Sequence, residues 1–136
     1  MIFQLDFATV MTLVLISYLG VSLIVFIVGI YIMQMYVSSK KWDDSFKIPL
    51  KINVIWLLIS IAIGIPLSFL FGDSVVIDYI RFGVNVVVGY ILAARYYKKD
   101  KGATFQVIIV IQLILFIIGV IFGSLFGMLI QFVLVN

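Results

Sequence analysis

Residues 105–135 read FQVIIVIQLILFIIGVIFGSLFGMLIQFVLV, a run of 31 residues without a charged side chain. A helix that crosses a hydrocarbon core of about 30 Å needs roughly 20 apolar residues, so this run is long enough to span a membrane. Three further apolar runs precede it, at about 7–37, 48–71 and 75–94. Unpaired backbone groups are too costly in lipid, so each run is predicted to form a transmembrane helix.

The composition of the whole chain agrees with four spans. Of 136 residues, 65% are hydrophobic and 11% are charged, which leaves too little polar surface for a soluble domain of this size. The fold class is therefore predicted as all-α, a four-helix transmembrane bundle, with residues 1–136 forming a single integral membrane domain. The spans are too long and too apolar for the strands of a barrel.

The residue types needed for most chemistry are missing. The sequence contains no cysteine, histidine or glutamate. It also lacks paired acids at catalytic spacing and a glycine-rich phosphate loop after a strand. We therefore predict that the chain is not an enzyme, that it has no catalytic residue, metal site or cofactor, and that it has no nucleic-acid partner.

The basic residues predict an orientation. Two connectors, 38–51 and 95–104, contain eight of the nine lysine and arginine residues. The positive-inside rule places both connectors in the cytoplasm and both termini outside, in a multi-pass protein of the cell membrane. Membrane lipids are then expected partners, and a role of the basic connectors in binding lipids or a docking partner is secondary to their role as orientation signals.

Local signals predict how the helices begin and bend. Pro49 falls in the first turn of the second span, where a missing N–H costs little, and Pro66 is expected to kink that span. A tight turn is expected at 72–74, where Asp73 or Ser74 can cap the third helix. Thr104 is expected to cap the fourth helix.

Two stripes of small residues recur 59 positions apart, each with a spacing of four. The first stripe consists of Ser60, Gly64 and Ser68, and the second of Gly119, Gly123 and Gly127. Residues at this spacing share one helix face, where small side chains allow another helix to approach closely. Both stripes are predicted to pack against helices, either of the same chain or of another one.

The same offset relates other residues. Asn53 corresponds to Gln112, and Phe46 corresponds to Phe105, without a gap. This register favours two tandem helical hairpins, 1–73 and 74–136, related by a pseudo-two-fold axis along the membrane normal. Chance similarity between apolar sequences is the alternative. The two amides are interpreted as interhelical polar contacts rather than as ligand groups.

One charged cluster falls inside a predicted span. Asp78, Arg81 and Asn85 lie on one face of the third helix at positions i, i+3 and i+7. They are candidates for an ion path, an anion path or a headgroup site, because a charge within a membrane is costly. The favoured interpretation is structural: Arg81 pairs with Asp78 and extends toward the outer headgroups, and Asn85 bonds to another helix.

Two functional hypotheses follow. The first is a small non-enzymatic protein that acts as an accessory or structural subunit of a larger membrane assembly, because packing surface is plentiful and chemistry is scarce. The alternative is a homo-oligomeric small channel or transporter with a polar path near Asp78, Arg81 and Asn85. In both cases the partners are other transmembrane helices, supplied by copies of this chain or by other membrane subunits.

Overall fold

The computed structural model describes residues 7–43, 45–71 and 75–135. These residues form four helices: α1 (Phe7–Ser39), α2 (Lys47–Phe71), α3 (Val75–Tyr97) and α4 (Lys101–Val135). All four are long and apolar enough to cross a membrane. The predicted all-helical bundle is confirmed to that extent, and the chain fits a small integral membrane protein.

The helices extend further into the connectors than expected. α1 continues to Ser39, α3 continues to Tyr97, and α4 begins at Lys101. Lys41 (φ 61°) and Lys98 (φ 54°) adopt left-handed backbone conformations just after α1 and α3. Such a residue commonly ends a helix, so both connectors leave their helix in the same way.

The prediction that Thr104 caps α4 is wrong. Thr104 lies inside the first turn, and its hydroxyl donates to the carbonyl oxygen of Asp100 at 2.9 Å instead of accepting from an N–H group. The helix begins earlier because Lys101 and Gly102 continue its geometry. The tight turn and the caps proposed at Asp73 and Ser74 lie outside the described residues. Pro66 lies within α2 without ending the helix.

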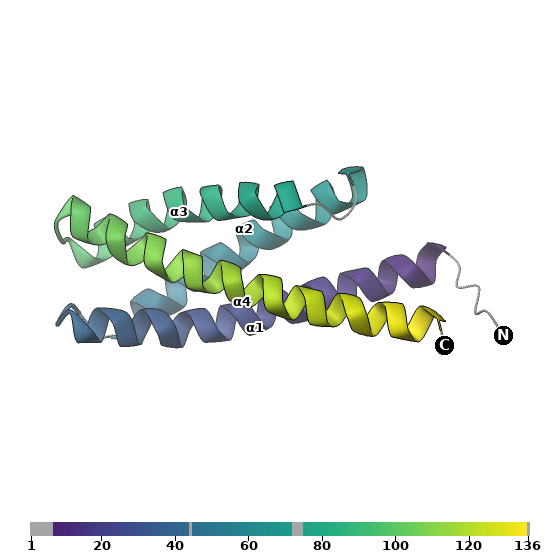
Figure 1. Cartoon of the computed structure of the whole chain (residues 1–136). Helices are drawn as coiled ribbons and strands as arrows, with labels where there is room; N and C mark the ends of the chain where they lie inside the picture. The colour runs from purple at the N-terminus through teal and green to yellow at the C-terminus, as the bar shows by residue number, and fades with distance from the viewer. Residues whose placement is uncertain (1–6, 44, 72–74, 136) are drawn as a thin grey trace.

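Each helix packs against two others. α1 contacts α2 and α4, and α3 also contacts α2 and α4. Figure 1 shows the four helices side by side at the end that carries the two basic connectors, called the basic end below. Toward Phe7 of α1 and Val135 of α4, these two helices run away from α2 and α3. This order is compatible with two similar hairpins, whereas the pseudo-symmetry stays a prediction.

The buried core lies in the half of the bundle next to the basic end. Its members are each at most 9% exposed and are Met33, Val37, Ile48, Ile52, Trp56, Ala93, Tyr97, Val107, Ile108, Ile111 and Leu115. Large exposed apolar side chains cover the outside of all four helices, as a lipid-facing surface would require. The half of the bundle farther from the basic end, called the open end below, contains fewer buried side chains. The polar groups of α3 lie where this half meets the buried core.

Candidate functional site

A polar cluster joins α1, α2 and α3 between the core and the open end. It consists of Tyr18 on α1, Ser60 on α2, and Asp78, Arg81 and Asn85 on α3. The sequence predicted the three α3 residues as candidates for an ion or ligand path, and it predicted Ser60 as a helix-packing residue. The spacing of the α3 residues identified one helix face, but it contained no information about which neighbouring helix this face would meet.

Arg81 is the centre of the polar cluster. One terminal nitrogen, Nη2, forms an ion pair with the Asp78 carboxylate one turn earlier on α3. The other, Nη1, donates a hydrogen bond of 2.9 Å to the hydroxyl of Tyr18. The guanidinium carbon also lies 5.4 Å from the centre of the Tyr18 ring, within the range of a cation–π contact. Arg81 therefore interacts with both its own helix and α1.

Tyr18 connects this charged pair to α2. Its hydroxyl accepts from Arg81 and donates to the backbone carbonyl of Ser60. The ring lies directly over Gly64: a Cβ atom at Gly64 would overlap the phenol oxygen and would lie only 2.9 Å from Cε2. Gly64 thus leaves room for the Tyr18 side chain, whereas the sequence had predicted the close approach of a helix backbone at this position.

Asn85 and Trp56 form the inner edge of the polar cluster. The indole Nε1 of Trp56 donates to the backbone carbonyl of Asn85 at 2.8 Å, and the Asn85 amide donates to Ser60 Oγ at 3.4 Å. The Trp56 ring lies against Gly89, where an added Cβ would be 3.0 Å from Nε1. Sequence reasoning missed Trp56. The one feature of the sequence that could have identified it is a tryptophan in the middle of a span, where the buried indole N–H needs a hydrogen-bond acceptor.

The predicted interhelical amides are both buried. Asn53 is 2% exposed and Gln112 is 5% exposed. Asn53 differs from expectation, because its amide donates to the carbonyl of Pro49 in its own helix at 2.8 Å. Its oxygen lies against Gly29 of α1, so the cross-helix interaction is a packing contact at a glycine.

The two stripes of small residues have different surroundings. In the α2 stripe, Gly64 is buried under Tyr18, and Ser68 lines a small pocket with the same side chain. In the α4 stripe, an added Cβ at Gly119 would only touch Val25 at 3.8 Å. At Gly123 and Gly127 it would meet no side chain and no neighbouring helix within 4 Å among the described residues. The outer part of the α4 stripe therefore has no packing partner within the described chain.

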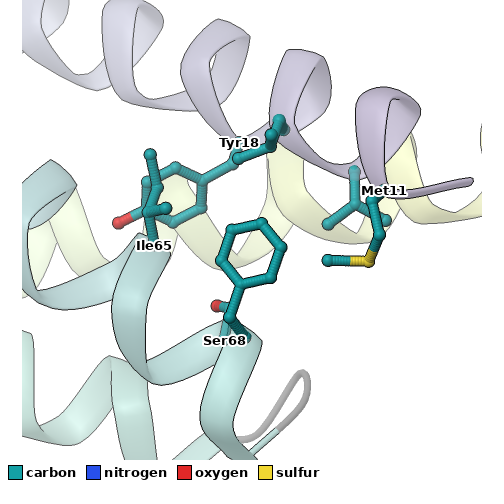
Figure 2. Close-up of a pocket in the computed structure, with 7 residues that line it drawn as sticks. Met11, Tyr18, Ile65 and Ser68 are labelled. Atoms are coloured by element: carbon teal, nitrogen blue, oxygen red, sulfur yellow. The ribbon is translucent and has the colours of Figure 1, made fainter. Parts of the chain in front are cut away.

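Two hollows occur toward the open end. A pocket of about 20 Å³ between α1 and α2 is mainly apolar, with Tyr18 and Ser68 as its polar members (Figure 2). Its lining residues are Met11, Val14, Leu15, Tyr18, Ile65, Ser68 and Phe69. A groove of about 180 Å³ lies between α1 and α4 and is lined by residues such as Leu13, Phe126 and Ile130. Neither hollow brings charged groups together.

The described residues contain no group of three or more carboxylate, imidazole or thiol side chains that could hold a metal ion. The chemistry at the polar cluster is thus that of a guanidinium, a carboxylate, an amide and two hydroxyl groups. The chain matches no protein-family model, and no curated protein or solved structure is significantly similar to it.

Proposed function

We propose that the protein is a non-enzymatic accessory or structural subunit that packs against other transmembrane helices in a larger membrane assembly. The observation that carries this proposal is the open face of α4, where Gly123 and Gly127 are exposed and an added Cβ would meet no other helix of the described chain within 4 Å. A glycine face allows two helix backbones to approach closely in lipid, where dispersion and weak hydrogen bonds drive association.

The bonding of the polar cluster supports a role without catalysis. Arg81 interacts with Asp78 and Tyr18, and Asn85 interacts with Trp56 and Ser60. These contacts connect three helices within the chain. A group that is already paired in this way contributes to stability and interhelical order more directly than to turnover.

The proposed orientation places the basic end in the cytoplasm of a cell membrane and both termini outside. Lys40 lies over the ring of Tyr36 at 5.5 Å, and Lys51 lies over that of Tyr96 at 5.4 Å. Aromatic rings beside lysines are typical of a membrane interface. Single cysteines at Ser39 and Gly102 should be shielded from an impermeant thiol reagent in intact cells, whereas a cysteine at Asn136 should react. Labelling of the first two from outside would reverse the orientation.

Capture from native membranes tests the subunit proposal. The wild-type chain should copurify with other membrane proteins at a fixed stoichiometry, and Gly123→Leu should lose them. Gly83→Leu is the matched control. Gly83 is an exposed helical glycine outside both stripes, and an added Cβ there would meet no described neighbour within 4 Å. Retention of the partners by Gly123→Leu would remove the α4 stripe as their binding face.

A homo-oligomeric channel or transporter is the second candidate. It is favoured by two buried atoms of the polar cluster, Arg81 Nε and Asn85 Oδ1, that have no hydrogen-bond partner among the described residues. Purification as a homo-oligomer without other proteins would support this candidate. Loss of flux in Arg81→Leu, with normal folding and assembly, would then separate it from the subunit proposal.

A further inference from the structure

Two polar atoms of the cluster differ from all its other donors and acceptors. Arg81 Nε and Asn85 Oδ1 are buried, and neither has a hydrogen-bond partner in the described part of the chain. The remaining nitrogens of these side chains are used, by Asp78, Tyr18 and Ser60. Arg81 and Asn85 are four residues apart on α3, so their side chains lie on the same face one turn apart.

The two atoms have complementary requirements. Arg81 Nε carries a hydrogen and needs an acceptor, whereas Asn85 Oδ1 needs a donor. Burying a polar group of this kind without a hydrogen-bond partner is unfavourable, and more so when the group is charged. A hydroxyl group offers both functions, because its oxygen accepts a hydrogen bond and its hydrogen is donated. A metal cation would be repelled by Arg81, and an ionised carboxylate has no hydrogen to donate to Asn85.

We propose that Arg81 Nε and Asn85 Oδ1 form a binding site for one hydroxyl group, that of a water molecule held between α1, α2 and α3. Asn85 is 7% exposed, whereas the side chains of Arg81 and Asp78 are 24% and 34% exposed. The site is therefore closed on the core side and accessible past the ion pair. The inference goes beyond the proposed function and does not depend on it.

The site has two oxidisable neighbours that can report on a bound water. The Tyr18 hydroxyl accepts from Arg81 Nη1, and the Trp56 indole donates to the backbone carbonyl of Asn85, the residue that carries Oδ1. Radiolytic hydroxyl-radical labelling of the full chain in detergent oxidises side chains beside ordered water even when they are buried. Met33 is the internal control, because it is intrinsically reactive, 0% exposed and surrounded by apolar core residues.

Tyr18 and Trp56 should be oxidised several-fold faster than Met33, and the added oxygen should derive from the solvent when the water is isotopically labelled. Arg81→Lys keeps the positive charge and removes Nε, so labelling of Trp56 should fall to the level of Met33. Arg95→Lys, at an exposed position of the same helix, should leave the labelling unchanged. Equal rates for Trp56 and Met33 in the wild-type chain would overturn the proposal, whether or not the variants fold.

Two further measurements identify the source of the hydroxyl group. Native mass spectrometry should find no copurified lipid whose retention depends on Arg81; such a lipid would assign the hydroxyl to a headgroup instead of water. Replacement of chloride by gluconate should leave the melting temperature of the wild-type chain unchanged. A chloride-dependent shift that disappears in Arg81→Lys would overturn the hydroxyl site in favour of an anion site.

Discussion

The α2 stripe and the α4 stripe have the same spacing, yet the middle glycine is covered by another helix of the described chain only in the α2 stripe. Gly64 lies under the Tyr18 ring, whereas Gly123, its counterpart 59 positions later, has open space beside it. Tyr18 of α1 supplies the side chain that fills the space beside Gly64. The residue 59 positions after Tyr18 is Ile77, which lacks a ring and a hydroxyl. A stripe of small residues thus leaves space on a helix surface. Whether that space is filled depends on which side chain the neighbouring helix presents there.

The largest difference between the stripes is expected for leucine substitutions. Gly64→Leu places a branched side chain where the Tyr18 ring lies and should cost about 1–3 kcal/mol of stability, as in overpacked cores. Gly123→Leu in the isolated chain should change stability by less than about 0.5 kcal/mol, as at other surface sites. Thermal unfolding in detergent measures both values. Equal losses would mean that the α4 stripe is also packed within the chain.

A second glycine pair extends the comparison to α3. Gly89 contacts the Trp56 indole, with Nε1 only 3.0 Å from an added Cβ, whereas Gly83 has nothing within 4 Å. Gly89→Ala should therefore displace the indole from the Asn85 carbonyl, at a cost of about 1–2 kcal/mol for the strain and the lost bond. Gly83→Ala should be neutral or slightly stabilising, since alanine favours helix.

The measurement is the fluorescence of Trp56 in a Trp42→Phe background, together with the melting temperature. A shift in the emission of Trp56 is expected in Gly89→Ala only. An unchanged spectrum with an unchanged melting temperature would show that the indole does not depend on this glycine.

The third prediction concerns the hydroxyl that fills the α2 stripe. Tyr18→Phe keeps the ring over Gly64 and the cation–π contact but removes the bonds to Arg81 and Ser60. The loss should be about 0.6–1.7 kcal/mol, between the mean and the largest value for interhelical hydrogen bonds in a membrane protein. In a double-mutant cycle with Arg81→Leu, the double variant should lose less stability than the sum of the two single losses, because both changes remove the same hydrogen bond. Strictly additive losses would exclude a direct interaction of Tyr18 with Arg81.

The sequence predicted the helices well because their signal is local. A long uncharged run, as at 105–135, has no alternative to helix in lipid, and a connector rich in basic residues borders each run at one end. The helix ends at Tyr97 and Lys101 were misplaced because charged residues continue a helix beyond the hydrocarbon core. The face of α3 with Asp78, Arg81 and Asn85 also followed from spacing alone.

The partners of that face could not be predicted, because they come from other helices. Tyr18 is 63 residues from Arg81 in the sequence, and nothing near either residue encodes their contact. Trp56 and Gly89 are a further example, since a large side chain and the glycine that accommodates it lie on different helices. The sequence spacing determines which residues share a helix face. Which neighbour that face meets depends on the rotation of the helix about its own axis, and this rotation is set by all the contacts of the bundle together.

The smallest effect in the α2 stripe is expected at Ser60, although Ser60 receives two bonds of the polar cluster. Tyr18 donates to its backbone carbonyl, which alanine retains. Only the bond from the Asn85 amide uses the side-chain oxygen, and its length of 3.4 Å is beyond the usual range of a strong hydrogen bond. Ser60→Ala should therefore lower stability by less than about 0.6 kcal/mol, the mean value for interhelical bonds in a membrane.

Ser124→Ala provides the matched control, because Ser124 is exposed on α4 and lies outside the stripe. The two variants should melt within the error of each other, and both should melt above Tyr18→Phe. A loss in Ser60→Ala as large as that in Tyr18→Phe would mean that the serine hydroxyl, and not the backbone carbonyl, holds α1 and α3 to α2. The α2 stripe would then be maintained by the side chain of one of its own members, and the tyrosine of α1 would be secondary.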